Sequence, residues 1–224
     1  MTDAAQQTGQ KPLKRELVLA STSPRRRELL SCLGIDFRVV PPSTLETMLP
    51  DETPREMVER LALSKAMSVA QSLSGGLVIG ADSVVVLDGR VLGKPVNSAQ
   101  AREMLRSLRS REHRVMTGLA LVDTANQDTR VASESSLVTM RDYSDNQLEA
   151  YVASGEPMDK AGAYAVQDRV FRPAEQLEGC YTNVMGLPLC SLVNMIRDAG
   201  LEVRSGQYKQ VTRECTQCPL KDVY

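Results

Sequence analysis

The chain has 224 residues, a formal net charge of −1 at pH 7, 42% hydrophobic residues and 25% charged residues. These ordinary proportions predict one globular domain, and the near-neutral charge excludes the broad basic field that non-specific nucleic-acid binding or an anionic membrane surface requires. No run of 18 apolar residues occurs, and the amino terminus lacks the apolar core of a signal peptide. We therefore expect a cytoplasmic protein that binds neither nucleic acid nor membrane.

The two ends of the chain differ from the rest. Residues 1–14 and 205–224 are polar and lack apolar periodicity, so we expect a flexible N-terminal segment and a polar C-terminal tail around a domain over residues 15–204. The tail holds a lone Cys215-x-x-Cys218 pair. Because the chain has one histidine and no second cysteine pair at similar spacing, we predict no structural zinc site there.

In the first half of the domain, strand and helix signals follow each other closely. Residues 17–20 predict a short buried strand, and Ser23-Pro24 then predicts the start of a helix that stops at Gly34. A strand over residues 37–40 precedes a capping box at residues 53–56, which opens a long helix to about residue 73. The valine-rich run 77–87 predicts a strand that turns at Asp88-Gly89 into another over residues 90–92.

The second half predicts a helix over residues 98–108 and two strands over residues 115–122 and 131–140. Ser144 and Gln147 frame a capped helix that ends at Gly155. After an irregular stretch, Pro188 opens a last helix that Gly200 closes, before a short strand over residues 201–203. Strands and helices are interleaved without strict alternation, so we predict an α/β fold with a mixed sheet.

Three arginines open the first predicted helix. Arg25, Arg26 and Arg27 stand where the helix dipole already presents positive charge, which costs about 0.3 to 1 kcal/mol per exposed cation. A bound polyanion would reverse this effect, because free N–H groups and guanidinium groups would converge on it. The alternative to an anion-binding site is a solvated basic patch.

Two charged residues fall on apolar stripes. Lys65 lies three and four residues after Ala62 and Leu61, on the buried side of its predicted helix, where it either serves a site or extends to the rim. Asp82 lies within the valine-rich strand next to Gly80. A carboxylate is costly to bury there unless it is paired, hydrogen-bonded or bound to a metal.

We favour a functional role for Asp82 over that of a core aspartate satisfied by backbone N–H groups. If its charge is buried at a cost, Asp82→Asn should melt no lower than the parent. His113 is the only histidine and opens a predicted strand, where a hydrogen-bonded structural role is the simplest account. No glycine-rich Walker loop or dinucleotide fingerprint occurs.

At this point the sequence resembles the Maf-like nucleoside triphosphate pyrophosphatases, in particular the branch acting on dTTP and UTP. The resemblance spans about residues 17–200. The motifs that carry it are Ala20-Ser21-Thr22-Ser23-Pro24-Arg25-Arg26, Ala62-Leu63-Ser64-Lys65-Ala66, Gly80-Ala81-Asp82-Ser83-Val84-Val85, Gly93-Lys94-Pro95, His113-Arg114-Val115-Met116-Thr117-Gly118, Asp159-Lys160-Ala161-Gly162-Ala163-Tyr164, Gln167 and Asn183-Val184-Met185-Gly186-Leu187-Pro188. Two parts depart from the family pattern, the loop over residues 168–176 and the tail from residue 205.

The resemblance implies an elongated mixed β-sheet with flanking helices and a central cleft between two lobes, as in inosine triphosphatase-like enzymes, often as a homodimer. It implies a divalent metal cation, Mg²⁺ or Mn²⁺. Carried over by position, the phosphate-binding residues are Ser21, Arg25, Arg26, Lys65 and Lys94, and the base-selecting residues are Arg25, Ser83 and Gln167. The metal ligands are Glu46 and Asp82. Asp82 also matches the catalytic acid-base, and whether it acts as base or as metal ligand stays open.

The expected reaction is hydrolysis of a nucleoside triphosphate at the α-β anhydride, giving the monophosphate and pyrophosphate. An alanine before Asp82 is similar to the dTTP/UTP branch, whereas the branch acting on 7-methyl-GTP typically has Gly-Ser-Asp-Gln at this point. Two other functions are compatible with the sequence, that of a 7-methyl-GTP pyrophosphatase and that of a nucleotide-dependent regulator of septum formation.

Overall fold

The computed structural model describes residues 15–203. The expected N-terminal segment and the tail with Cys215 and Cys218 lie outside these residues. None of the helices within residues 15–203 combines the length and the apolar character that crossing a bilayer demands.

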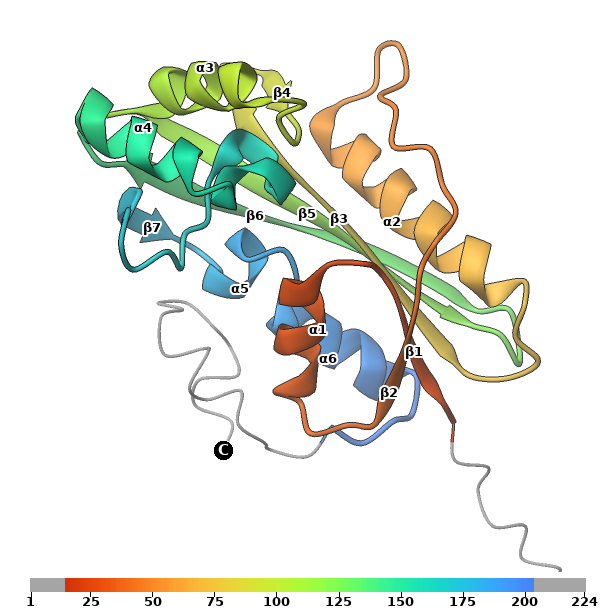
Figure 1. Ribbon diagram of the computed structural model, residues 1–224. Coiled ribbons are helices and arrows are strands. Elements are labelled where there is room, and N and C mark those ends of the chain that lie inside the picture. Colours follow the sequence, from red (N-terminus) through yellow and green to blue (C-terminus); the bar gives the residue numbers. More distant parts are fainter. Residues whose placement is uncertain (1–14, 204–224) are drawn as a thin grey trace, which may run out of the picture.

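The sheet is mixed, as predicted (Figure 1). Its strands run in the order β2-β1-β3-β5-β6-β7, with β4 paired to β3. β1 pairs in parallel with β2 and β3, and all other pairs are antiparallel. The strands are β1 (Leu17–Ala20), β2 (Phe37–Val40), β3 (Leu77–Leu87), β4 (Arg90–Leu92), β5 (Glu112–Asp123), β6 (Thr129–Met140) and β7 (Ala174–Glu178).

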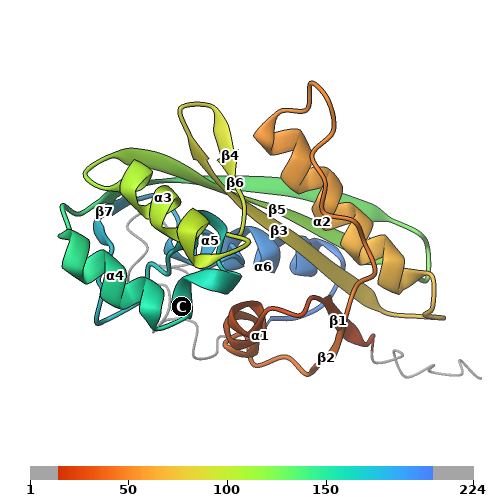
Figure 2. The same ribbon diagram turned by 45° about the horizontal axis from the view of Figure 1, so that its top comes forward.

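Helices cover both faces of this sheet (Figures 1 and 2). They are α1 (Pro24–Ser31), α2 (Pro54–Ala70), α3 (Ser98–Leu108), α4 (Asp145–Ala153), α5 (Tyr181–Val184) and α6 (Leu189–Asp198), with 3₁₀ turns η1 (Glu156–Asp159) and η2 (Ala161–Ala163). The predicted caps form: Ser23 accepts a hydrogen bond at the start of α1, and capping boxes open α2 and α4. At the β3–β4 turn Asp88 and Gly89 both have positive φ, as a two-residue hairpin requires.

Successive side chains of β3 point to opposite faces of the sheet and therefore pack in different parts of the core. Val78 packs with α2 on one face. On the other face, Leu77 and Ile79 belong to a core shared with α1 and α6, whereas Val85 and Leu87 belong to a second core with α3 and α4. The interval between these two cores is therefore the place where polar side chains can enter the sheet.

The middle of β3 lacks a strand neighbour on one side. β1 pairs with it only as far as Ala20 opposite Gly80, and β4 begins to pair at Val85. Within the described residues, 81–84 have no strand partner on that edge, while β5 pairs with them on the other. Asp82 and Ser83 lie in this gap, and their side chains point to opposite faces.

Two expectations need correction. The predicted strand at residues 201–203 does not form, because the N–H of Leu201 is used to close α6 on the carbonyl of Ile196. The stretch after Gly155 that we expected to be irregular contains η1, η2, α5 and the edge strand β7. These elements are short and lack apolar periodicity, so no sequence pattern predicts them.

Two glycines let α2 lie close to the sheet. A Cβ on Gly80 would lie 2.1 Å from the carbonyl oxygen of Ala62, and a Cβ on Gly118 would lie 2.1 Å from that of Val58. Both atoms belong to the helix backbone, which cannot rotate away as a side chain can. This approach holds Lys65 of α2 against Asp82 of β3.

We expect Gly118→Ala to lower the free energy of unfolding by about 1–3 kcal/mol, the usual cost of overpacking a core. Chemical denaturation measures this change. The matched control is Gly75→Ala, because an added Cβ there meets nothing within 4 Å. Equal stability of the two variants would contradict the close helix–sheet contact.

Candidate active site

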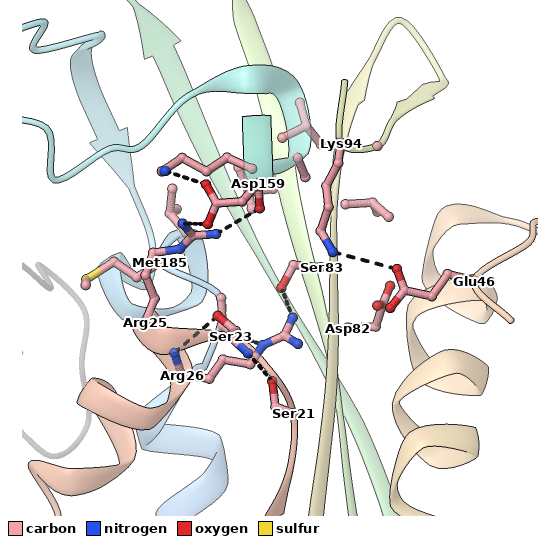
Figure 3. Close-up of a pocket in the computed structure, with 18 of the residues that line it drawn as sticks. Ser21, Ser23, Arg25, Arg26, Glu46, Asp82, Ser83, Lys94, Asp159 and Met185 are labelled. Atoms are coloured by element: carbon pink, nitrogen blue, oxygen red, sulfur yellow. Dashed lines mark hydrogen bonds and ion pairs between the residues drawn. The ribbon is translucent and has the colours of Figure 1, made fainter. Parts of the chain in front are cut away.

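A cleft of about 550 Å³ lies beside the gap in β3 (Figure 3). All nine residues expected at a site from the sequence line it, namely Ser21, Arg25, Arg26, Glu46, Lys65, Asp82, Ser83, Lys94 and Gln167. They come from the loop after β1, the start of α1, the loop before α2, α2 itself, β3, the loop after β4 and the segment after η2. Residues far apart in the sequence thus meet where β1 ends.

The loop after β1 presents Ser21 and two of the three arginines to the cleft. Ser21 is almost fully buried, and its hydroxyl accepts a hydrogen bond from the backbone N–H of Ser23 at 3.1 Å. Arg25 and Arg26 line the cleft, whereas Arg27 does not and is exposed. The solvated-patch alternative therefore applies to Arg27 alone.

Arg26 is held by the protein on one side of its guanidinium. Its Nε donates to the carbonyl of Gly186 at 2.8 Å, and its Nη2 donates to the hydroxyl of Ser83 at 3.0 Å (Figure 3). Burial lowers the pKa of Arg26, and the charges of Asp82 and Glu46 oppose that effect. Arginine remains charged at any relevant pH, so a fixed cation faces the cleft.

Lys65 and Asp82 form a buried ion pair. Lys65 Nζ lies 2.6 Å from Asp82 Oδ1 and 2.5 Å from Glu46 Oε1. Lys65 is only 5% exposed and Asp82 only 7%. Lys65 therefore does not extend to the rim as the alternative had it. Removing one partner of such a pair leaves a buried charge uncompensated. The prediction that Asp82→Asn relieves charge burial and repulsion from Glu46 does not fit this geometry, because Lys65 lies between the two carboxylates. The variant removes an ion pair and should melt lower than the parent.

Glu46 connects the ion pair to the open side of the cleft. Burial alone would raise its pKa, but the hydrogen bond and charge of Lys65, together with Lys94 and Arg26, hold the pKa of the Glu46 carboxyl below its usual value. Lys94 Nζ lies 3.9 Å from Glu46 Oε2 (Figure 3). Glu46 is thus an anion at neutral pH, within reach of two lysines.

The two carboxylates suit a hard divalent cation in part. Glu46 and Asp82 each contact the same ammonium group, so their oxygens converge on one point. Across residues 15–203, however, no group of three or more His, Cys, Asp or Glu could hold a metal ion. Mg²⁺ is commonly bound by one or two carboxylates, with water and substrate phosphates as the other ligands. This donor set fits such a cation.

Apolar side chains also line the cleft. They include Val85, Val115, Ala161, Tyr164, Ala165, Val184 and Met185, and the amide of Gln167 lines the same cleft. Gln167 carries both hydrogen-bond donors and an acceptor, so it can pair with the edge of a heterocycle. The cleft therefore offers cations to a polyanion and apolar side chains to a flat group.

Sequence reasoning gave no role to Asp159 and Lys160, which also line the cleft. Asp159 Oδ1 accepts from Lys160 Nζ at 2.6 Å, and its Oδ2 accepts from Arg25 Nη1 at 3.1 Å. Burial acts to raise the pKa of Asp159, yet Lys160 and Arg25 lower it overall. Their place in the Asp159-Lys160-Ala161-Gly162-Ala163-Tyr164 motif was the available signal.

His113 has the structural role expected of it. Its Nε2 lies 2.6 Å from the hydroxyl of Tyr164, which lines the cleft. Its Nδ1 is buried without a hydrogen-bond partner among the described residues. Burial lowers the pKa of His113 from 6.5 to about 4, so the folded protein holds a neutral ring.

Comparison with known proteins identifies relatives of this chain. A family model described as "Maf-like protein" matches residues 16–199. The chain is 51% identical to the dTTP/UTP pyrophosphatase of Pelotomaculum thermopropionicum over 189 residues, 84% of this chain and 99% of that protein. It is 44% identical to the dTTP/UTP pyrophosphatase of Dictyoglomus thermophilum, over 84% of this chain and 98% of that one.

Among solved structures, the Staphylococcus aureus Ham1 protein aligns with 57% of this chain and 73% of its own, at 19% identity and a TM-score of 0.42. That likeness is too distant to carry an argument about the site. The mixed α/β fold rests on the sheet topology itself.

The buried ring of His113 predicts a pH dependence of stability. Between about pH 6.5 and pH 4 the unfolded chain binds a proton at this position and the folded protein does not, so stability falls as the pH falls through this window. Between pH 7 and pH 5, the melting temperature of His113→Gln should fall less than that of the parent. Tyr164→Phe keeps the buried ring and should retain the parent's dependence. Identical pH profiles for parent and His113→Gln would contradict the account.

Proposed function

Because this chain belongs to the family of Maf-like proteins, we propose that it hydrolyses dTTP and UTP to the monophosphate and pyrophosphate. The observation that carries the proposal is the buried ion pair of Lys65 and Asp82 at the floor of a cation-lined cleft. A module that only bound a polyanion would gain nothing from a carboxylate there. The names of the relatives at 51% and 44% identity support the choice of pyrimidine substrates.

The triphosphate is assigned to the cations that line the cleft. These are Arg25, Arg26, Lys65 and Lys94, and the Ser21 hydroxyl lines the cleft with them. Arg26 and Lys65 are held by partners within the protein before substrate arrives, whereas the side chain of Lys94 is 60% exposed and lies 3.9 Å from Glu46. Such preorganised charge is the main source of catalysis in phosphoryl transfer. These groups neutralise the charge that develops on pyrophosphate as it leaves.

Asp82 is assigned to activate the attacking water. Its Oδ1 is occupied by Lys65, and its Oδ2 has no hydrogen-bond partner among the described residues. In this proposal, Oδ2 accepts the proton as the water oxygen bonds to the α-phosphorus and the bond to the bridging oxygen breaks. Lys65 fixes the orientation of the Asp82 carboxylate by pairing with it.

We include Mg²⁺ or Mn²⁺ in the proposal, which Glu46 would hold together with water and substrate phosphates. Asp82 would be a second ligand in the alternative in which it is not the base. Bound there, a divalent cation would supply Lewis-acid stabilisation of charge on the phosphate oxygens. The lowered pKa of the Glu46 carboxyl supports this assignment, because an anion faces the cleft.

The base is assigned to the part of the cleft lined by Tyr164, Gln167 and Met185. Tyr164 and Met185 offer apolar contact to a ring, and Gln167 offers a donor and an acceptor to a pyrimidine edge. A 7-methyl-GTP pyrophosphatase remains the alternative within the family. A turnover screen across dTTP, UTP, CTP and 7-methyl-GTP separates the two, because the proposal requires the highest kcat/KM with dTTP or UTP.

With Mg²⁺ or Mn²⁺, we expect dTTP and UTP to yield pyrophosphate as the first phosphorus-containing leaving group, detected by phosphorus NMR. In ¹⁸O-labelled water, attack at the α-phosphorus places the label in the monophosphate. Orthophosphate as the first product would contradict the proposal. Label in pyrophosphate would instead show attack at the β-phosphorus and remove Asp82 from the assigned role.

A further inference from the structure

Ser83 connects Arg26 to a line of hydrogen bonds that leads away from the cleft. Arg26 Nη2 lies 3.0 Å from Ser83 Oγ, and Ser83 Oγ lies 2.9 Å from Thr117 Oγ1. Thr117 Oγ1 lies 3.1 Å from the backbone oxygen of Asn183. Ser83 lines the cleft, whereas Thr117 and Asn183 are fully buried behind it.

Proton counting fixes the direction of every bond in this line. The carbonyl of Asn183 can only accept, so Thr117 spends its one hydroxyl proton on it. Thr117 must therefore accept from Ser83, which spends its own proton there. Arg26 can only donate, and Ser83 accepts from it with a lone pair. Ser83 consequently keeps one lone pair, and no proton, for any further contact.

The sheet holds this line rigidly. Ser83 and Thr117 face each other directly in the antiparallel β3–β5 pair, between the two apolar cores. Asn183 is anchored through its side-chain nitrogen, which donates to the Val115 carbonyl at 3.0 Å and to the Ser136 hydroxyl at 2.9 Å. The acceptor presented to Arg26 is therefore fixed by backbone and buried side chains.

We infer that Ser83 and Thr117 are positioning residues that hold Arg26 toward the phosphate chain. The inference rests on the proposed function for the identity of the substrate. It adds a role to the base selection that the family resemblance implies for Ser83. Of the five N–H donors of the guanidinium, two are used within the protein, and the others remain for phosphate oxygens.

Loss of this support should lower turnover of every substrate. Ser83→Ala leaves Arg26 with the Gly186 carbonyl as its one acceptor on this side, and Thr117→Val removes the acceptor that orients the Ser83 hydroxyl. A misplacement of about 1 Å can cost on the order of 10²-fold in rate. We expect each variant to lower kcat/KM at least about 10-fold for dTTP, UTP and CTP. Thr117 is buried and does not line the cleft, so Thr117→Val should leave the ratios among the three substrates unchanged.

Conservative variants and a contrast variant accompany this test. Ser83→Thr and Thr117→Ser keep both hydroxyls and should stay close to the parent. Gln167→Ala should change the ratios among the three substrates. In an Arg26→Ala background, Thr117→Val should cause no further loss, a coupling that a defect in folding alone would not produce.

Binding of inorganic tripolyphosphate, measured by calorimetry, tests the inference without any base or turnover. Ser83→Ala and Thr117→Val should weaken its binding, while Gln167→Ala should leave it unchanged. Parent-like binding in both hydroxyl variants would overturn the inference, as would a Thr117→Val variant that changes base ratios as much as Gln167→Ala. Failure of the parent to release pyrophosphate would instead overturn the proposed function and leave the tripolyphosphate test in force.

Discussion

The structure depends on one buried ion pair at the point where α2 crosses β3. Neither Lys65 nor Asp82 could be buried alone, because an unpaired charge in an apolar interior costs several kcal/mol. Their contact requires the close approach that Gly80 and Gly118 permit. The same contact brings in Glu46 from the loop before α2. The helix–sheet packing and the charged floor of the cleft are thus one arrangement.

The second constraint is the gap along β3 between the end of β1 and the start of β4. A continuous sheet would bury this edge, whereas here Asp82 and Ser83 both line the cleft while pointing to opposite faces. Asp82 faces α2 and pairs there with Lys65. Ser83 faces the interval between two apolar cores, where Thr117 and Arg26 complete a polar line. One strand therefore serves both charge placement and cation positioning.

Much of the fold was predictable from local signals. The caps at Ser23, Thr53 and Ser144 and the Asp88-Gly89 turn are short-range features, and each formed as expected. The charges at Lys65 and Asp82 were anomalous in sequence, but their pairing depends on a helix–sheet contact that local patterns do not encode. Strand β7 is short and half exposed, so no periodicity marked it. Glu46 was indicated by the family resemblance alone.

The most direct test of the account is kcat for pyrophosphate release from dTTP by Asp82→Asn, with circular dichroism and a thermal melt on the same sample. Lys65 retains Glu46 as a partner in this variant. The account predicts a folded protein with a lower melting temperature and a kcat reduced by about 10² to 10⁴, the typical cost of losing a catalytic base. Parent-like turnover, or inactivity caused by unfolding alone, would contradict it.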